Sequence, residues 1–394
     1  VTSATPEQWA SFYEDLATIF QAEPLPLRGK KILLGSTNQL LAADDTPTDR
    51  RKGRQADIYF SPVVGQDSGE AEVDTTPIPV QDLPETLRDS FAFLHPKLLW
   101  NDANRRKTKA RLFLEPHFVL DYRKEDILRT LGEVTRDDRT GQKARLDALE
   151  WAFRVWSSGR ALSDSEVAAA RFRVPAQSGW IPATDAMFGD GWKDLQGTEL
   201  ERLLRRAAPD SPALMHASQR LIPSFDNWPI RFGEENGWRA FLVAAGVVDY
   251  LRPWSLGEVT DLVQGAFLAD RIEHAANLEE NTKRLWRQRL GPGATNIPNP
   301  NTDYRCNTPV WAIPGQEEHA VLSTEAKIQF ARQLLRMIPN LNDSHWTLRI
   351  FRPGRPENQT NRQTWPTPLE AFLGAAAWIP VKRSGRGTAF RATT

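Results

Sequence analysis

Residues 173–185 read Arg-Val-Pro-Ala-Gln-Ser-Gly-Trp-Ile-Pro-Ala-Thr-Asp, and this stretch decides the fold class. Two short apolar segments flank a polar turn, which predicts a β-hairpin at 172–184, and Thr184-Asp185 then leads into a helix. Related strand-and-turn patterns recur at 32–42, 310–315 and 378–381, with spacings too uneven for a solenoid. We therefore expect an α+β fold in which short antiparallel β-hairpins are decorated with helices.

The chain divides into three expected modules. Residues 1–139 form an α/β module with an N-terminal helix, 140–293 form a mainly helical module with the hairpin, and 304–394 form a smaller α/β module. Gly291-Pro292-Gly293 ends the helical module. The Asn- and Pro-rich stretch 294–303 is the best linker candidate, because both residue types favour turns.

The first module is expected to open with a helix. Thr5-Pro6-Glu7-Gln8 combines an N-cap, a proline at the first helical position and a capping-box glutamine, and apolar residues follow at helical spacing. A packed helix with so little lead-in favours a segment cut from a larger protein, with a processed chain as the alternative. Beyond it we expect a strand at 31–34 returning through 40–41, a strand at 58–60, and a helix over 82–96.

Helices dominate the middle of the chain. Two Ser-x-x-Glu capping boxes lie at Ser163–Glu166 and Ser255–Glu258, and the second is expected to open a long helix through Phe267. Further helices are predicted at 142–156, 195–207 and 235–246. After the linker we expect a strand pair near 308–322, a helix over 323–337, and a final strand–helix–strand unit.

Composition excludes several classes of protein. The 394 residues contain 50 Lys and Arg against 50 Asp and Glu, which argues against a strongly basic protein that coats nucleic acid. The single cysteine, Cys306, excludes an internal disulfide framework and a Cys-rich zinc site. No apolar run approaches the roughly 20 residues that cross a bilayer, so we expect a cytoplasmic chain without a membrane partner.

No catalytic constellation stands out. The chain lacks a phosphate-binding loop and a Gly-x-Ser-x-Gly elbow, and its six histidines have no metal-site spacing. Glu317-Glu318-His319 could supply ligands near Cys306, but a solvated turn explains them better. Cys306 itself is expected to be a small buried residue. We assign this segment no catalytic residue, no metal and no cofactor.

One trace of a nuclease stays open as an alternative. Glu325-x-Lys327, with Asp303 upstream, has the spacing of a carboxylate and lysine that flank a metal ion in nucleases. Glu325 follows Ser323-Thr324 at an expected helix start, however. A carboxylate there is explained by the unpaired amides and the helix dipole.

A basic run is the main candidate for nucleic-acid binding. Arg105, Arg106, Lys107, Lys109 and Arg111 form it, and shorter basic clusters lie at 50–54 and 383–386. Such a run can neutralise phosphates without an overall basic charge, and the flanking Trp100 and Phe113 could stack on bases. The alternative is a solvated loop between a helix and a strand.

Most tryptophans are expected to be core residues. Many of the fourteen lie beside apolar residues or prolines, where a large rigid ring fills space. Those with such neighbours are Trp180, Trp192, Trp228, Trp238, Trp254, Trp311, Trp346 and Trp378, and core packing explains most of them better than stacking on a cation or a base.

Three phrases carry a family resemblance. They are Phe91-Ala92-Phe93-Leu94-His95-Pro96, Gly179-Trp180-Ile181-Pro182-Ala183-Thr184-Asp185-Ala186-x-Phe188, and Trp238-x-x-Phe241-Leu242-x3-Gly246-Val247-x3-Leu251-Arg252-Pro253. Together they resemble the region after the ATPase in sacsin-like and No Vein-like proteins, which pair an HSP90-type (GHKL) ATPase with long arrays of such modules. That ATPase needs Glu-x3-Asn and Asp-x-Gly-x-Gly. Neither Glu279-Glu280-Asn281 nor Asp190-Gly191-Trp192 fits these patterns.

The resemblance implies a non-catalytic scaffold or partner-contacting segment of a large ATPase with chaperone-like or phage-defence associations. Its expected partners are other domains of the same large protein and a protein or nucleic acid. The alternative, from the basic run, is a nucleic-acid-contacting module of a defence or repair complex.

Overall fold

The computed structural model describes residues 4–20, 30–35, 39–42, 58–59, 83–88, 90–95, 98, 108–118, 124–157, 163–193, 195, 197–207, 211–290, 301–306, 308–352, 362–383 and 387–392. It confirms the α+β fold, in which helices combine with short strand pairs and small sheets. Internal contacts divide the chain into two compact units, residues 1–174 with 229–246 and residues 175–228 with 247–394. The three module boundaries stay a prediction.

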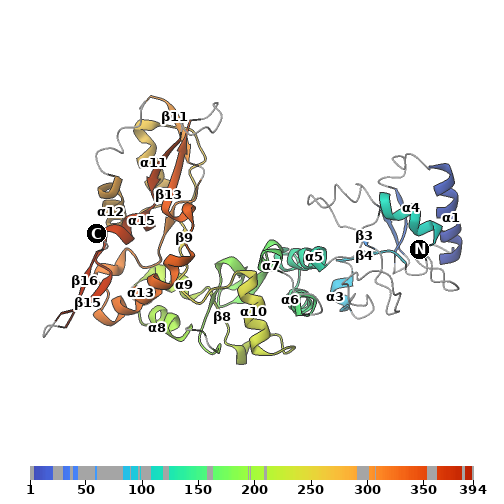
Figure 1. The fold of residues 1–394 in the computed structure, drawn as a ribbon, viewed down its shortest axis with the longest axis horizontal. Coiled ribbons are helices and arrows are strands. Elements are labelled where there is room, and N and C mark those ends of the chain that lie inside the picture. The colour runs from blue at the N-terminus through green and yellow to red at the C-terminus, as the bar shows by residue number, and fades with distance from the viewer. Residues whose placement is uncertain are drawn as a thin grey trace. The chain divides into compact units, whose positions relative to one another are not determined.

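The first unit is mainly helical and carries two short strand pairs. β1 and β2 form the expected antiparallel hairpin, whereas β3 and β4 pair in parallel. Its elements are α1 (Pro6–Ile19), β1 (Lys31–Leu34), β2 (Leu40–Ala42), β3 (Ile58–Tyr59), α3 (Glu85–Arg88), β4 (Ala92–Phe93), α4 (Lys109–His117), α5 (Lys124–Arg136), α6 (Gln142–Ser157), α7 (Asp164–Ala169) and α10 (Glu235–Ala245), labelled in Figure 1 where there is room.

A buried tyrosine joins the first helix to the first hairpin. α1 starts at the expected Thr5 capping box, and Tyr13 on its inner face is fully buried. The Tyr13 hydroxyl donates to the Ile32 carbonyl at 2.9 Å and accepts from the Leu34 N–H at 2.8 Å. Because both partners lie on β1, the two bonds fix the helix against the hairpin. α4 packs along α1 on the same small core (Figure 1).

Aromatic stacking joins α10 to α6 in the same unit. The rings of Phe153 and Trp238 stack with centroids 4.3 Å apart and planes 14° from parallel. The Trp238 indole donates to the Phe232 carbonyl at 2.6 Å. Gly233 lies against this stack with a φ of +85°, and a Cβ there would come within 2.5 Å of the Phe153 ring. Both the positive φ and the lack of space for a Cβ therefore require glycine at this position.

The second unit combines helices with a four-stranded sheet. Its elements after β5 (Arg173–Ala176), which spans the junction of the two units, are β6 (Gly179–Pro182), η4 (Ala183–Asp185), β7 (Met187–Phe188), α8 (Gly197–Ala207), α9 (Pro212–Ser218), β8 (Leu221–Ile222), η6 (Phe225–Asn227), β9 (Trp254–Ser255), β10 (Val263–Gln264), η7 (Gly265–Phe267), α11 (Leu268–Ala275), α12 (Glu280–Leu290), β11 (Asp303–Cys306), β12 (Trp311–Ala312), η9 (Glu318–Ala320), α13 (Thr324–Met337), η10 (Ile338–Asn340), α14 (Asp343–Trp346), β13 (Thr347–Phe351), β14 (Arg362–Pro366), α15 (Pro368–Ala375), β15 (Ile379–Arg383) and β16 (Gly387–Arg391).

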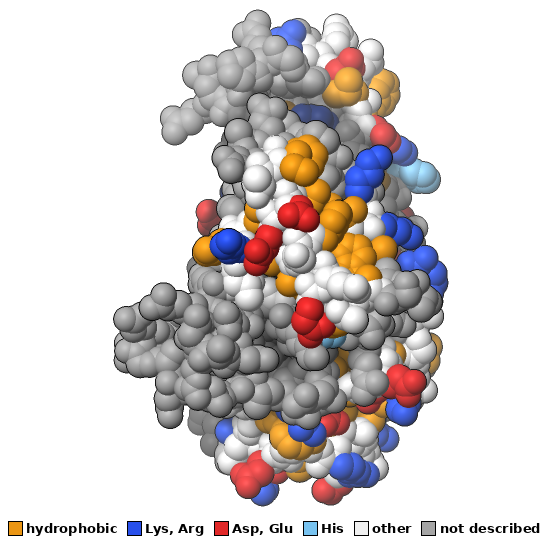
Figure 2. Space-filling model, turned by 90° about the vertical axis from the view of Figure 1, so that its right-hand side faces the viewer, with side chains coloured by type: hydrophobic (Ala, Val, Ile, Leu, Met, Phe, Trp, Pro, Cys, Tyr) orange, Lys and Arg blue, Asp and Glu red, His pale blue; other side chains and the backbone are white. Residues whose placement is uncertain are grey.

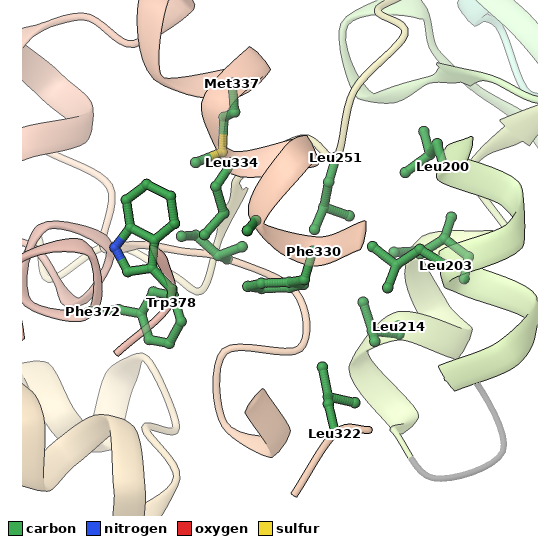
Figure 3. Packing of buried hydrophobic residues seen from close by; sticks show 14 of the residues in the cluster. Leu200, Leu203, Leu214, Leu251, Leu322, Phe330, Leu334, Met337, Phe372 and Trp378 are labelled. Atoms are coloured by element: carbon green, nitrogen blue, oxygen red, sulfur yellow. The ribbon is translucent and has the colours of Figure 1, made fainter. Parts of the chain in front are cut away.

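The larger core of this unit lies around α13. Phe330, Leu334 and Met337 on one face of that helix are fully buried. They meet leucines from α8 and α9 and the rings of Phe372 and Trp378 from the C-terminal segment, as Figure 3 shows. Burial of this many large apolar side chains is the main source of stability for the unit.

A second core lies on the four-stranded sheet. The strands follow the order β10-β11-β13-β14, and every neighbouring pair is antiparallel. Leu348 and Ile350 of β13 and Cys306 of β11 point into this core, where Trp286 of α12 is fully buried. The Trp286 indole donates to the Pro366 carbonyl at 2.8 Å, which fixes α12 to the last strand of the sheet.

The prediction that a helix opens at Ser255–Glu258 is wrong. Ser255 instead lies in β9, which pairs with β12, and the first helical element after β9 is η7. The Leu256 N–H donates to the Val310 carbonyl, and the Val310 N–H donates to the Gly257 carbonyl, each at 2.9 Å. The backbone N–H and carbonyl groups that a helix would have paired internally are thus hydrogen-bonded to a distant segment, so tertiary structure overrides the local capping pattern.

Two further predictions need correction. α3 ends at Arg88, and residues 92–93 form a strand because they pair with β3 rather than continuing the helix. The strand pair near 308–322 is reduced to β12, whose partner is β9. The residues after β12 turn through Gly315, which has a φ of +82°, into η9.

Other predicted elements agree with the structure. β6 follows β5 after two residues, as expected for 172–184, and the helices near 142–156, 195–207, 235–246 and 323–337 are confirmed as α6, α8, α10 and α13. Within the residues that the structure describes, no helix is both long enough and apolar enough to span a bilayer.

Truncating Phe330 tests the larger core. Because the ring is fully buried, Phe330→Ala should lower the free energy of unfolding by about 3–5 kcal/mol, measured by urea denaturation. Leu335 on the same helix is 59% exposed, so Leu335→Ala is a matched control expected to change stability by less than about 0.5 kcal/mol. Equal losses in the two variants would contradict the assigned core.

Candidate functional site

The basic run is only partly described. Arg105, Arg106 and Lys107 lie outside the described residues. Lys109 is the exposed first residue of α4 and pairs with Glu14 at 4.0 Å, and Arg111 is half-buried in the first turn of the helix. Thr108 caps this helix, because its hydroxyl accepts from the Arg111 N–H at 3.0 Å. The run therefore ends in a helix start and not in a loop.

The aromatic residues expected to flank this run do not both serve as stacking platforms. Phe113 is buried in the core formed with α1, where its ring lies 5.8 Å from that of Phe118. It is not available to a base, so this part of the prediction is wrong. Trp100 and the cluster at 50–54 lie outside the described residues, and so do residues 384–386.

The segment Glu317-Glu318-His319 is not a solvated turn. The Glu317 carboxylate accepts the backbone N–H groups of Asn281 and Thr282 at 2.6 and 2.7 Å, at the start of α12. The Glu318 carboxylate accepts the Ser211 hydroxyl at 2.6 Å. Both acids thus satisfy donors at the starts of helices, and in the described part of the chain no group of His, Cys, Asp and Glu side chains is arranged to bind a metal ion.

His319 is a buried histidine in an apolar setting. It is 5% exposed and lies 5.4 Å from both the Phe330 and the Phe372 ring centroids. Its Nε2 is buried and has no hydrogen-bond partner among the described residues. Burial, with a smaller effect of the positive charge of Lys327, lowers the pKa of His319 from 6.5 to about 4. The side chain is therefore neutral at physiological pH.

The remaining sequence candidates are spread over different elements. Asp303 lies at the start of β11, whereas Glu325 and Lys327 lie in the first turn of α13. The Lys327 ammonium donates to the Ala320 carbonyl at 2.7 Å. Cys306 is buried, as expected, and contacts the Thr308 carbonyl at 3.4 Å. These contacts are those of structural residues.

Side chains from six segments of the second unit lie around the β9–β12 ribbon, and we term them the aromatic–basic cluster. Most are half-buried, and His216 is exposed. The segments are η4, α9 with the turn after it, the loop before β9, β9 itself, β12 and α14. The cluster consists of Asp185, His216, Arg220, Tyr250, Arg252, Trp254, Trp311 and His345.

One half of the cluster is built around Trp254. Its ring centroid lies 5.8 Å from that of His216 and 6.0 Å from the Arg220 guanidinium carbon. An Arg220 nitrogen lies 3.5 Å from His216 Nε2. A guanidinium over an indole face is a cation–π arrangement, which orients the charge while leaving the edge of the guanidinium open to a further acceptor.

The other half of the cluster is built around Trp311. Because Trp311 pairs with Ser255 and Ala312 with Trp254, the two indoles lie on opposite faces of the β9–β12 ribbon. The Trp311 centroid lies 4.5 Å from that of His345. The indole N–H groups of Trp254 and Trp311 are both buried and have no partner among the described residues.

Arg252 joins the two halves electrostatically. Burial lowers the pKa of Arg252, Arg220 lowers it further, and Tyr250 and Asp185 oppose the shift. Burial lowers the pKa of His345 as well, and the charge of Arg252 adds to that effect. Two arginines thus lie near two carboxylates, because Asp185 acts on Arg252 and Asp249 acts on Tyr250.

Few features of the sequence point to this cluster. Trp254 and Trp311 were expected to be core residues together with Trp180 and Trp346, yet all four are only half-buried. Trp192, Trp228, Trp238 and Trp378 are buried as predicted. An Arg-Pro-Trp tripeptide is a weak signal by itself, because its neighbours come from segments far away in the chain.

The comparisons with known proteins leave the resemblance as a prediction. No protein-family model matches the chain, and no match was found among curated proteins or solved structures.

The titration of His319 generates a stability prediction. The unfolded chain binds a proton on this side chain below about pH 6.5 and the folded chain only near pH 4, so acidification favours unfolding across that interval. The loss should reach about 3 kcal/mol at pH 4. Chemical denaturation at a series of pH values measures it.

A matched pair of variants isolates this effect. His319→Leu should remove this contribution to the pH dependence, whereas His274→Leu, at an exposed histidine of α11, should leave it unchanged. Burial and the charges of Glu317 and Glu318 raise the pKa of Glu279 in all three proteins, so that contribution cancels in the comparison. A His319→Leu profile that parallels the unaltered protein would contradict the assignment.

Proposed function

We propose that this chain is a non-catalytic, partner-contacting segment of a large cytoplasmic sacsin-like protein whose HSP90-type ATPase lies outside the segment. Its partners would include other domains of the same protein and a further protein. A chaperone-like or phage-defence role of the whole assembly is part of this proposal. It needs no cofactor in the segment itself.

One observation carries the proposal. Two of the three phrases behind the resemblance converge beside the aromatic–basic cluster. The Phe188 N–H donates to the Val248 carbonyl at 2.8 Å, and the Val248 N–H donates to the Ala186 carbonyl at 3.4 Å. Asp185 from the second phrase and Arg252 from the third are electrostatic neighbours within the cluster. The residues that define the resemblance thus frame a potential contact surface.

The composition of the cluster supports a protein partner. Trp, Tyr and Arg are the residue types that dominate the binding energy of protein interfaces, and the cluster contains two tryptophans, one tyrosine and two arginines. Figure 2 shows a different face, the one on the side of α1 in Figure 1, where charged side chains of both signs and hydrophobic side chains are interspersed among the described residues.

Lack of ATP turnover is the direct test of the non-catalytic role. The purified chain should show a cooperative unfolding transition and hydrolyse ATP no faster than buffer in a phosphate-release assay. The reading frame upstream of Val1 should also encode Glu-x3-Asn followed by Asp-x-Gly-x-Gly. Turnover that stays with the pure chain would overturn the proposal, as would an upstream frame without the ATP-site motifs.

Nucleic-acid contact is the second candidate function, and the exposed position of Lys109 within the basic run favours it. If the run binds phosphates, the affinity for a single-stranded oligonucleotide should fall steeply with salt. Arg105→Glu combined with Arg106→Glu should weaken binding at low salt by about ten-fold or more. Arg202→Glu combined with Arg205→Glu on α8 changes the net charge equally and serves as the control. Equal effects of the two double variants would reject this site.

A further inference from the structure

We propose that one face of the four-stranded sheet binds the phosphate backbone of a single-stranded nucleic acid. We term this side of the sheet the arginine face, and its main described residues are Gln264, Asp303, Arg305, Arg349, Phe351 and Thr364. The inference adds a function to the proposed protein contact and does not rest on it. It follows from the directions of the side chains on the sheet, from their charges and from their exposure.

The register of the sheet separates its residues into two faces. Side chains alternate between the faces along each strand, and directly paired residues share a face. Cys306 and Ile350 are paired and lie in the apolar core, to which α11, α12 and α15 also contribute residues (Figure 1). Arg305 and Arg349 are their neighbours in the chain and therefore lie on the opposite face. That face is exposed at Arg305 and Thr364, whereas the three helices pack on the other one.

Arginine positions extend across three neighbouring strands of this face. Arg305 of β11 pairs with Phe351 of β13, which on its other side pairs with Arg362 of β14. Arg349 lies two residues before Phe351 and pairs with Thr364. Strands in a sheet are about 4.8 Å apart and rise about 3.4 Å per residue, so the three arginine positions lie within about 10 Å of one another. The positive charges are thus gathered on one side of the sheet.

The two described arginine side chains of this face have no carboxylate partner. Arg305 is exposed, and its guanidinium carbon lies 4.5 Å from the centroid of the Phe351 ring. Arg349 is half-buried, and neither arginine forms an ion pair with a described residue. On α12, by contrast, Arg287 and Arg289 are both paired with carboxylates. A guanidinium held over an aromatic ring keeps its N–H edge for an incoming oxyanion.

One carboxylate lies on the same face, at its margin. Asp303 starts β11 and pairs in register with Gln264 of the edge strand β10. Because β13 runs antiparallel to β11, Asp303 lies at the end of the sheet away from Arg349. The arginine positions on β11, β13 and β14 therefore outweigh this single described acid, and the net charge of the face is positive.

The exposed residue types favour a nucleic acid over a protein partner. Protein interfaces are centred on accessible aromatic or aliphatic anchors. The exposed side chains among the described residues of the arginine face are all polar, and Phe351 is only 9% exposed beneath Arg305. Guanidinium and hydroxyl groups, such as those of Arg305 and Thr364, donate to phosphate oxygens without reading the bases.

The shape of the face favours a single strand over a duplex. Proteins read duplex DNA mainly by inserting a helix or a two-stranded ribbon into a groove. The arginines lie instead on the flat side of paired strands, and two of them belong to β11 and β13, which have neighbours on both edges. A flexible single strand can bring successive phosphates onto such a positively charged face.

Fluorescence anisotropy with labelled oligonucleotides tests this proposal on the full chain. The probe is a fluorescein-labelled oligothymidylate, and an oligouridylate of equal length compares RNA with DNA. A labelled duplex and a labelled poly-glutamate peptide are the other comparisons. We expect saturable binding of the single strands at about 50 mM salt, with an affinity that falls as salt is added.

Charge reversal and a matched control localise the binding. Arg305→Glu combined with Arg349→Glu should weaken binding by about ten-fold or more at low salt. Arg202→Glu combined with Arg284→Glu makes the same charge change at exposed arginines of α8 and α12 and should stay within about three-fold. Thermal unfolding of each variant identifies any loss of binding that comes from misfolding.

Two further readouts respond to phosphate contact and not to a loss of structure. Arg305→Gln combined with Arg349→Gln should make the slope of log affinity against log salt shallower by about 1.4, because each contact with a single strand contributes about 0.7. Asp303→Asn should tighten binding by about two-fold or more, because it removes a carboxylate that repels phosphates. Misfolding does not tighten binding.

Several outcomes would overturn the proposal. They are the absence of single-strand binding at low salt, equal effects of the two double Glu variants, and tighter binding of the duplex or of the poly-glutamate peptide than of the single strands. Binding that is lost with Arg105→Glu and Arg106→Glu, but kept with Arg305→Glu and Arg349→Glu, would place the nucleic acid on the basic run instead.

Discussion

The second unit depends on one half-buried anchor, the carboxylate of Glu317 at the start of α12. It accepts two backbone N–H groups that the helix cannot satisfy internally. The preceding residue, Gln316, accepts from the Ile313 N–H and donates to the Thr282 hydroxyl, so the turn closes on itself and on the helix at once. Because buried polar groups are costly unless paired, the segment has few alternative conformations.

The same segment also determines the geometry of the aromatic–basic cluster. β12 with Trp311 ends five residues before Glu317, and Glu318 after the anchor accepts the Ser211 hydroxyl. Ser211 in turn caps α9, because its hydroxyl oxygen accepts the Leu214 N–H at 3.1 Å. α9 and the turn after it carry His216 and Arg220. A structural anchor therefore positions residues from both halves of the cluster.

The net charge says little about this protein, because opposite charges are paired within single elements or between neighbouring ones. Fifty cationic and fifty anionic side chains cancel over the chain, and many of them pair within one element or between neighbours, as Arg154 does with Glu150. Glu273, almost fully buried between α11 and α12, is balanced by Arg287 and Lys283. Against this background of compensated charge, an arginine such as Arg220 that forms no described ion pair becomes a functional candidate.

Local signals in the sequence were sufficient for elements whose interactions are local. The Thr5 and Ser163 capping boxes, the hairpin near Trp180 and the helix after Ser323 follow from residues within a few positions of one another, so the sequence alone determined them. Pairing with distant strands decided the rest. Ser255-x-x-Glu258 has the pattern of a helix start, but the backbone of Ser255 pairs with β12. Residues 92–93 likewise pair with β3 instead of continuing a helix. The cluster is of the second kind: its members are spread from Asp185 to His345, and only tertiary packing brings an uncompensated arginine beside a tryptophan.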